Sequence, residues 1–423
     1  MDSAILRHVT PDVVVVGGGA IGVSAALELA SRGARVTLLE QGAELAAGCS
    51  AGNAGLICPS HSAPIANPAA LRQGLRWMLK SDSPFYLRPR PSVMPWIARF
   101  VAASRAGRAE AGTRAIRELS LASLELHAAL AEVGIETSFE RRGVLNVYET
   151  EDGLVAGTRE AERSRMRTEI LEPEKARELE PSLGPSIAGA VYYPEEAHCD
   201  PLRFVHAVGR AAAEAGAEIR TGVEVRGLRR RDGHVAVDTS EGELHPEAVV
   251  LAAGAWTSEL ARPLGVFLPL EAGKGYHVDL EPAEGDPQVP VFMQESRVIA
   301  TPLEGRLRLA GTLELAGLDL SISGKRVEAI RRAGARVLRG QEGRQTLEVW
   351  SGLRPCTPDG LPVIGRPAGI DGLVLATGHA MKGLSLAPVT GRLVAEVVTG
   401  EPPSHDLAPF SPNRFRPLRP RAR

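Results

Sequence analysis

The stretch DVVVVGGGAIG at residues 12–22 decides the fold. Four consecutive valines lead into three glycines, and small residues typical of a helix follow. This order predicts a buried parallel strand that turns directly into a helix. Gly17, Gly19 and Gly22 have the G-x-G-x-x-G spacing, which permits a tight turn, close approach of a pyrophosphate and close helix–strand packing. The stretch therefore predicts a dinucleotide site at the helix N-terminus.

A second predicted strand, residues 35–39, ends in Glu40 and follows a helix expected over residues 20–32. A carboxylate at a strand end, about 20 residues beyond the glycines, suits the hydroxyls of an adenosine ribose. An acid rather than an arginine here argues against a 2′-phosphate, and so against NADP. The alternative is a βαβ unit that binds nothing, and the combination of glycines and acid disfavours it.

The chain has 423 residues, a formal net charge of -2 and 4 cysteines. This length predicts two packed domains rather than one core. The nearly neutral charge gives no indication of a nucleic-acid partner. Cys49, Cys58, Cys199 and Cys356 form no C-x-x-C pair and no Cys/His cluster, so neither a metal site nor a disulfide framework is expected.

The chain shows no signal-peptide pattern and no apolar run of membrane-spanning length, which predicts a cytoplasmic protein. Residues 413–423 are basic and rich in proline, and we expect them to form a disordered tail. Contact of this tail with an anionic membrane surface stays open, as does assembly into a homo- or hetero-oligomer.

The pattern along the chain predicts that the dinucleotide domain is interrupted. A loop of small residues, 48–56, is expected to lie against a ligand, a flexible connection being the alternative. Many prolines and poor periodicity over residues 59–96 indicate a departure from that domain. We expect the nucleotide domain to comprise residues 8–80, 198–262 and 347–412, and the second domain residues 81–197 and 263–346.

Three motifs occur together: the glycine loop with Glu40, the strand ending LAAGAW at residues 251–256, and SGLRPCTPDG at 351–360 followed by PVIG and ATGH. From residue 12 to about 412, the chain resembles the family of FAD-dependent D-amino-acid oxidases and dehydrogenases, which includes glycine and sarcosine oxidases. The segment after residue 59 looks most like bacterial D-amino-acid dehydrogenases and hydroxy-D-proline dehydrogenases. The resemblance implies an α/β fold: a glutathione-reductase-like FAD-binding Rossmann domain with an interleaved α+β substrate domain built on a large antiparallel sheet.

The resemblance also implies FAD as the cofactor. Val225, ending its strand, would lie by the adenine, and backbone amides at His379 would stabilise negative charge on the reduced flavin. The residues implied for FAD are Gly17, Gly19, Ala20, Ile21, Gly22, Glu40, Gln41, Ser50, Ala51, Asn53, Ala54, Gly55, Leu56, Val225, Ala253, Gly254, Trp256, Gly378, His379, Lys382, Gly383 and Leu384.

Arg354 is the expected binding group for the substrate carboxylate, because a guanidinium binds a carboxylate bidentately. It also matches the arginine of the family's Gly-Leu-Arg-Pro motif; the alternative is an ion pair with Asp359. Tyr276 is the second expected catalytic residue, donating its phenol to substrate or closing the pocket, unless it is a core aromatic. His61 is expected at the pocket mouth or as a solvated loop residue.

No acid–base pair is evident, which predicts direct hydride transfer from the substrate Cα to flavin N5 without an obligatory protein base. Sarcosine oxidases attach FAD through a cysteine whose position here is matched by Gly352, so we predict non-covalent FAD. They also use an oxygen-activating lysine. No lysine lies between Lys274 and Lys325, although Arg308 stands on a plausible strand. This favours a quinone or another acceptor over O₂.

The sequence therefore predicts oxidative deamination of D-amino or D-imino acids such as D-alanine, D-proline or hydroxy-D-proline. One alternative is an O₂-using oxidase of glycine, sarcosine or D-amino acids. Another, from a different class, is a flavin-binding subunit of an electron-transfer complex. A bare NAD-binding protein is least favoured. The side chain of the substrate and the oligomeric state stay open.

Overall fold

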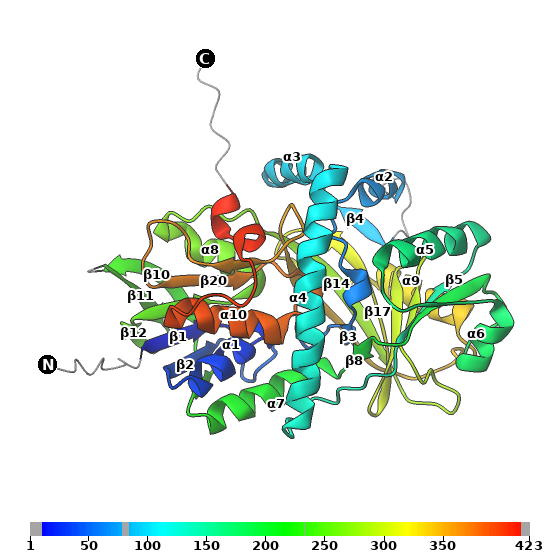
Figure 1. The fold of residues 1–423 in the computed structure, drawn as a ribbon, viewed down its shortest axis with the longest axis horizontal. Coiled ribbons are helices and arrows are strands. Elements are labelled where there is room, and N and C mark those ends of the chain that lie inside the picture. The colour runs from blue at the N-terminus through cyan, green and yellow to red at the C-terminus, as the bar shows by residue number, and fades with distance from the viewer. Residues whose placement is uncertain (1–10, 78–83, 232, 416–423) are drawn as a thin grey trace, which may run out of the picture.

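The computed structural model describes residues 11–77, 84–231 and 233–415. Figure 1 shows two large sheets side by side, each with helices packed on it, and the long helix α4 (Ala106–Glu132) running across the junction between them. Residues 8–10, the expected domain boundary at 80/81 and the part of the expected tail over 416–423 lie outside the described residues.

The nucleotide-binding motif lies in a six-stranded sheet of order β19-β20-β13-β1-β2-β9. β1 (Asp12–Val16) is central and parallel to both β2 (Arg35–Glu40) and β13 (Ala248–Leu251). Because β2 and β13 lie on opposite sides of β1, its carboxyl end is the switch point at which such sheets bind ligands. The other strands are β9 (Glu218–Thr221), β19 (Val363–Gly365) and β20 (Leu373–Thr377).

The four valines of β1 explain why this strand is buried on both sides. Val13 and Val15 face a core formed with α1 (Ala20–Ser31), α7 (Pro201–Glu214), α10 (Ala387–Thr399) and α4. Val14 and Val16 face a second core beneath the small sheet of β10 (Val225–Arg231), β11 (His234–Thr239) and β12 (Gly242–Leu244). A strand buried on both faces requires an unbroken apolar run, as the sequence indicated.

The second large sheet has nine strands, in the order β18-β14-β17-β16-β15-β5-β7-β6 with β4 beside β17. It is mainly antiparallel, as expected, with parallel pairing only of β15 with β5 and of β17 with β4. Its strands are β4 (Phe85–Leu87), β5 (Val144–Tyr148), β6 (Glu169–Leu171), β7 (Gly189–Tyr193), β14 (Glu271–Leu280), β15 (Val291–Met293), β16 (Val298–Leu303), β17 (Arg306–Leu315) and β18 (Thr346–Cys356).

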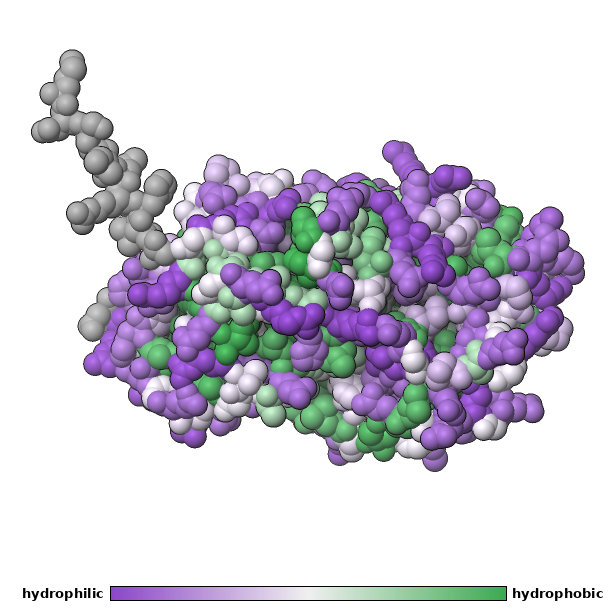
Figure 2. Space-filling view, turned by 90° about the horizontal axis from the view of Figure 1, so that it is seen from below, coloured by the Kyte–Doolittle hydropathy of each residue, from purple (hydrophilic) through white to green (hydrophobic). Residues whose placement is uncertain are grey.

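Helices cover the outer face of this sheet, where α9 (Gly324–Val337) and α6 (Pro173–Leu179) share an apolar core with β14 and β17. The remaining helices are α2 (Pro68–Trp77), α3 (Met94–Ala103), α5 (Glu151–Ser164) and α8 (Thr257–Ala261). Within the described ranges, no helix has both the length and the apolar character needed to cross a bilayer. Figure 2 shows apolar residues in separate groups among polar ones over the face seen from below.

Three segments differ from the expected pattern. β18 pairs with β14 in the nine-stranded sheet, so the chain rejoins the six-stranded sheet only at β19, later than residue 347. The strand expected to end at Val225 stops at Thr221, because Gly222 takes φ 74° and breaks it, and Val225 instead begins β10. The first residues of the expected tail, 413–415, are held by an ion pair between Arg414 and Asp359. The division into two domains stays a prediction.

Gly22→Ala should damage the α1–β1 contact, because a Cβ at position 22 would lie 1.8 Å from the carbonyl oxygen of Gly17. We expect a loss of stability of at least about 1–3 kcal/mol, the usual cost of overpacking. Thermal unfolding and flavin content measure it. Gly107→Ala in α4 is the control, because apart from the adjacent helix backbone the described residues place no atom within 4 Å of the added Cβ. Equal melting temperatures and flavin contents for the two variants would contradict this account.

Candidate functional site

The glycine loop brings backbone atoms unusually close together. Gly17 takes φ 108°, and a Cβ there would lie 2.6 Å from the carbonyl oxygen of Ala252. A Cβ on Gly19 would lie 2.9 Å from Oγ of Ser50. That hydroxyl accepts the N–H of Ala20 at 3.0 Å, while the N-cap residue of α1, Gly19, has no side chain with which to cap the helix. The result is a narrow backbone surface ending in a helix N-terminus, which suits a pyrophosphate.

Glu40 lies at the carboxyl end of β2, beside this loop. Its two carboxylate oxygens accept the N–H groups of Gly18 at 2.7 Å and Gly42 at 2.8 Å. The N–H of Val223 donates to the carbonyl of Glu40 at 2.9 Å, so the chain entering β10 at Val225 lies against the same strand end. The acid is thus fixed in position while its remaining lone pairs stay available to a ribose.

The ends of β13 and β20 meet at the same edge of the sheet. The hydroxyl of Thr377 donates to the carbonyl of Gly254 at 3.0 Å. His379 is buried, and its Nε2 lies 3.0 Å from Oγ1 of Thr390 in α10, so the ring is turned toward that helix. Burial lowers the pKa of His379 to about 3 and keeps the imidazole neutral.

Contacts between loops join the remaining residues of the implied FAD set to this edge. Nδ2 of Asn53 donates to the carbonyl of Met381 at 3.2 Å, and Nζ of Lys382 donates to the carbonyl of Ala63 at 3.2 Å. Leu384 is buried in the core that contains β1. The segments brought together are 17–22, 40–41, 50–56, 253–256 and 378–384, with Val225 beside the second of them.

Arg354 lies on β18 with its side chain across Gly275 of β14, where a Cβ would be 2.1 Å from Nη2. Its Nη1 donates to the carbonyl of Thr312 at 2.7 Å. Burial lowers the pKa of the guanidinium. In the part of the chain that the structure describes, no carboxylate pairs with Arg354, and the alternative partner Asp359 instead pairs with Arg414 at 2.7 Å. Within the described ranges, this half-buried cation therefore has no carboxylate counterion.

Tyr276 lies on the opposite face of β14, since successive residues of a strand point to opposite faces. Its side chain is fully buried in the apolar core that includes Ile330 of α9, and its hydroxyl donates to Glu314 at 2.6 Å. The structure thus does not bring Tyr276 to Arg354. It shows the alternative, a core aromatic on a sheet, and we correct the expectation accordingly.

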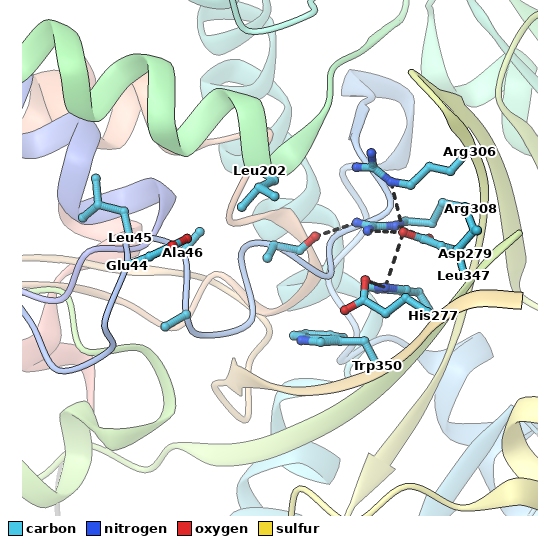
Figure 3. A pocket seen from close by; sticks show the side chains of 13 residues that line it. Glu44, Leu45, Ala46, Leu202, His277, Asp279, Arg306, Arg308, Leu347 and Trp350 are labelled. Carbon is cyan, nitrogen blue, oxygen red and sulfur yellow. Dashed lines mark hydrogen bonds and ion pairs between the residues drawn. The ribbon is translucent and has the colours of Figure 1, made fainter. Parts of the chain in front are cut away.

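A cavity of about 430 Å³, which was not predicted from the sequence, lies between the loop after β2 and the nine-stranded sheet (Figure 3). The lining residues on the loop and α7 side are Glu44, Leu45, Ala46, Ala47, Ala51 and Leu202. Those on the sheet side are His277, Asp279, Arg306, Arg308, Leu347, Glu348 and Trp350. Figure 3 shows Arg306 and Arg308 converging on Asp279.

Arg308 connects the large sheet to the loop implied for flavin binding. Its Nε and Nη2 donate to the two oxygens of Asp279, both at 2.8 Å. Its Nη1 donates to the carbonyls of Ala51 at 2.5 Å and Asn53 at 3.0 Å. Burial alone would raise the pKa of Asp279, but Arg308, with His277 and Arg306, lowers it below its usual range. Each of the three nitrogens of this guanidinium therefore already donates at least one hydrogen bond.

His277 and Trp350 form an aromatic wall of the same cavity. Their rings stack with centroids 5.2 Å apart and an interplanar angle of 9°. Nε2 of His277 lies 3.2 Å from Oε2 of Glu348, and burial followed by the charge of Arg308 lowers the pKa of His277. The two-residue spacing of His277 and Asp279 on one strand was the available sequence signal, because it places both on one face.

His61 is not a solvated loop histidine. Its ring packs against Phe292, with centroids 5.2 Å apart, and lies 6.2 Å from the ring of Tyr193. Its Nε2 lies 3.3 Å from Nδ2 of Asn146 on β5. The side chain therefore lies between the loop after β3 (Leu56–Ile57) and the nine-stranded sheet.

The chain matches a protein-family model over residues 12–397, and that family is described as FAD dependent oxidoreductase, DAO. A protein named D-amino acid dehydrogenase from Paramagnetospirillum magneticum is 33% identical over 416 residues, which cover 95% of this chain and 98% of that protein. A protein named D-amino-acid oxidase from Bradyrhizobium diazoefficiens is also 33% identical, covering 95% and 98%.

Solved structures show the same architecture. Glycine oxidase from Geobacillus kaustophilus superposes with a TM-score of 0.78 at 29% identity, covering 96% of this chain and 99% of that one. L-proline dehydrogenase from P. horikoshii superposes with a TM-score of 0.77, covering 96% and 98%, and at 22% identity it shows likeness of fold alone.

Arg308→Leu should destabilise the protein by up to about 3–5 kcal/mol, because the buried Asp279 loses its bidentate partner and keeps only the guanidinium of Arg306, at 3.0 Å. Because folding lowers the pKa of Asp279, the ion pair contributes its full stabilisation above the pKa of an aspartate in the unfolded chain. This stabilisation is lost as the pH falls through the pKa that Asp279 has in the folded protein. The stability difference between wild type and variant should therefore shrink at acid pH. Urea unfolding at neutral and acid pH measures it.

Arg229→Leu is the matched control, because its ion pair with Asp238 at 3.0 Å is exposed and should contribute less than about 1 kcal/mol. The double variant Arg308→Leu/Asp279→Leu should recover part of the lost stability, since it removes the buried carboxylate that has lost its bidentate partner. Equal losses of unfolding free energy in Arg308→Leu and Arg229→Leu would show that the buried ion pair contributes no more than the exposed one.

Proposed function

The chain belongs to the family of FAD-dependent oxidoreductases, and from this premise we propose that it oxidatively deaminates D-amino or D-imino acids. The substrate class is supported by relatives named D-amino acid dehydrogenase and D-amino-acid oxidase, at 33% identity over nearly the whole chain. The observation that carries the proposal is Arg354, a half-buried guanidinium to which the described residues offer no carboxylate.

The residues at the edge of the six-stranded sheet fit FAD. The close backbone at Gly17 and Gly19 and the start of α1, where the N-cap residue Gly19 has no side chain, suit its pyrophosphate, and Glu40 suits the adenosine ribose. Segment 50–56 and segment 378–384 would hold the flavin end. Bound FAD supplies the electron sink that accepts the substrate hydride, which no side chain can supply.

Arg354 would bind the substrate through its carboxylate. The bond from Nη1 to Thr312 fixes the guanidinium plane, and Gly275 leaves room for it on the inner face of the sheet. A bidentate contact fixes orientation as well as charge, so it would hold Cα in one position for hydride loss.

The groups beside Arg354 support hydride transfer without a protein base. The nearby titratable groups are the thiols of Cys49 and Cys356. Burial raises the pKa of Cys49 and raises that of Cys356 to about 12, so neither is a thiolate at neutral pH. The amine would therefore enter as the neutral form, having lost its proton to water, and the imine product would hydrolyse in water.

The charged groups favour a quinone or another acceptor over O₂. Arg308 cannot take the place of an oxygen-activating lysine while it is held by Asp279 and two carbonyls. Lys274 is buried on the face of β14 that carries Tyr276, with Nζ 3.3 Å from Asp319. The cytoplasmic location, membrane contact and oligomerisation stay predictions.

The second candidate is an O₂-using D-amino-acid oxidase. Lys382 favours it, because burial lowers the pKa of this lysine to about 8 and it lies in the segment implied for the flavin edge. A relative at 33% identity is named D-amino-acid oxidase.

Anaerobic flavin reduction tests the proposal. D-alanine, D-proline and hydroxy-D-proline should bleach the flavin, whereas the matched L-isomers, glycine and sarcosine should not. Bleaching by L-amino acids alone, or by none of the panel, would overturn it. Peroxide yield with and without an added dye then separates the oxidase from the dehydrogenase.

Arg354→Leu should raise KM and lower kcat/KM by about 3–5 kcal/mol, because the carboxylate loses its charge partner. Arg354→Lys should restore part of the activity, since it returns the charge without the bidentate geometry. Arg414→Leu is the control: it removes a neighbouring guanidinium that pairs with Asp359 and should leave KM unchanged. Nearly wild-type kinetics in a folded, flavin-loaded Arg354→Leu protein would remove this residue from the site.

The flavin should be released completely by acid precipitation, leaving a colourless pellet. Gly352 offers no nucleophile and is covered by the ring of Trp350, while the thiol of Cys356 is buried and protonated. Cys356→Ser should give the same result as wild type. Yellow colour retained in the wild-type pellet would show a covalent link.

A further inference from the structure

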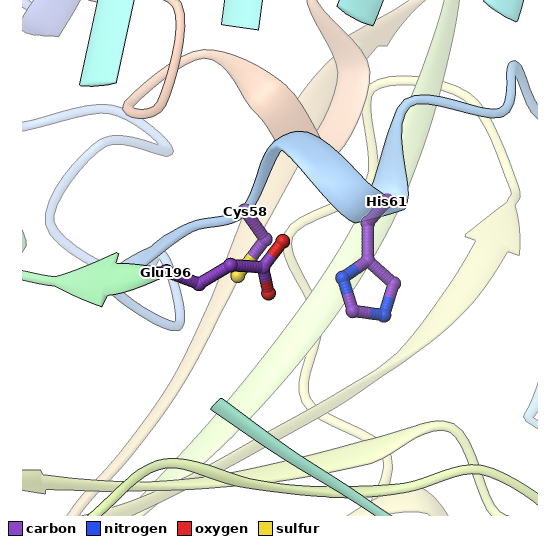
Figure 4. Close-up of side chains that lie close together, drawn as sticks. All are labelled: Cys58, His61 and Glu196. Carbon is purple, nitrogen blue, oxygen red and sulfur yellow. The ribbon is translucent and has the colours of Figure 1, made fainter. Parts of the chain in front are cut away.

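A short antiparallel ladder brings three metal-ligating side chains together. β3 pairs with β8 (Ala197–His198) through Leu56 with His198 and Ile57 with Ala197. Continuing this register by one residue places Cys58 opposite Glu196. The turn that follows, η1 (Pro59–His61), then brings His61 back to the same place. Figure 4 shows the thiol and the carboxylate adjacent, with one nitrogen of the imidazole turned toward them.

The ligand atoms are close enough to share one ion. The thiol sulfur, a ring nitrogen and a carboxylate oxygen all lie within 4.8 Å of one another. Oε1 of Glu196 accepts the N–H of Ser60 at 2.7 Å. Its Oε2 is buried and, among the described residues, has no hydrogen-bond partner of good geometry. A buried carboxylate oxygen without a hydrogen-bond partner destabilises the folded protein, and a bound cation would offset this loss of free energy.

The three side chains offer a thiol, an imidazole and a carboxyl group, which bind metals in their deprotonated forms. Binding of a cation therefore releases protons to solvent, and the affinity should rise with pH.

We infer that Cys58, His61 and Glu196 form a binding site for one zinc ion, with water as a fourth ligand. Thiolate, imidazole and carboxylate are the donors that zinc takes, and three protein ligands leave one position open. The thiolate and the carboxylate together neutralise the dication, and their protons pass to solvent when it binds. The positive charges of Lys382 and Arg297, which act on His61, reduce the affinity.

A second cluster, formed by His277, Asp279 and Glu348, also brings ligand atoms together. Its central carboxylate is already neutralised, since Arg308 binds both oxygens of Asp279 and Arg306 lies 3.0 Å from one of them. A metal there would have to displace guanidinium groups. Among the residues with described positions, no guanidinium pairs with Glu196, which leaves its carboxylate available to a metal.

Cobalt(II) is the probe, because its visible bands report tetrahedral geometry at wavelengths longer than flavin absorption and its charge-transfer band reports thiolate ligation. The FAD-loaded protein is treated with chelator, desalted and titrated with CoCl₂. We expect one equivalent to bind with a thiolate band, more tightly as the pH rises, and ZnCl₂ to displace it. Failure of the folded wild-type protein to bind cobalt would overturn the inference.

Variants assign the site. Cys58→Ser should abolish the thiolate band, and His61→Ala and Glu196→Gln should weaken binding by at least about tenfold, the loss that even outer partners of metal ligands cause. Cys199→Ser, which changes a buried thiol next to β8 outside the cluster, should bind normally. An unchanged thiolate band in Cys58→Ser, or loss of binding in His277→Ala alone, would contradict the assignment. None of these readouts depends on amino-acid oxidation.

Discussion

The buried ion pair of Arg308 and Asp279 determines how the nine-stranded sheet is placed relative to the loop after β2. The guanidinium binds both carboxylate oxygens from within the nine-stranded sheet and donates to two carbonyls of the loop after β2. One side chain thereby fixes the distance between the sheet that carries Arg354 and the loop implied for the flavin. Because the charges are out of water, this link tolerates little displacement, and substrate and cofactor groups can be held in register.

The valines of β1 and the glycines after it predicted the first sheet, because a strand buried on both faces and a tight phosphate-binding turn each leave a local pattern. β18 was harder to assign. Its motif belongs to the family signature, yet its pairing is with β14, and strand partners far apart in sequence are not encoded locally. The end of the strand before Val225 was missed because one glycine, Gly222, breaks it.

The residues of the candidate site likewise include some that the sequence could predict and some that it could not. Arg354 could be proposed from its motif, and its lack of a described carboxylate partner supports that choice without testing it. Whether Tyr276 reaches the site depends on which face of β14 it occupies. The contact of Gly275 with the Arg354 guanidinium shows that Arg354 lies on the other face, and the sequence does not contain this information. Cys58 and His61 are close in sequence, but Glu196 lies just before β8, far along the chain, so no spacing rule could join them.

The ion pair of Arg414 with Asp359 gives the chain's end a structural role close to the β18 segment. Asp359 follows the strand that carries Arg354, and Arg414 also donates to the carbonyl of Leu361 at 2.8 Å. Any truncation or affinity tag designed for crystallisation should therefore begin beyond residue 415. Cutting earlier would leave Asp359 without its cation and would weaken the packing of the segment that follows β18.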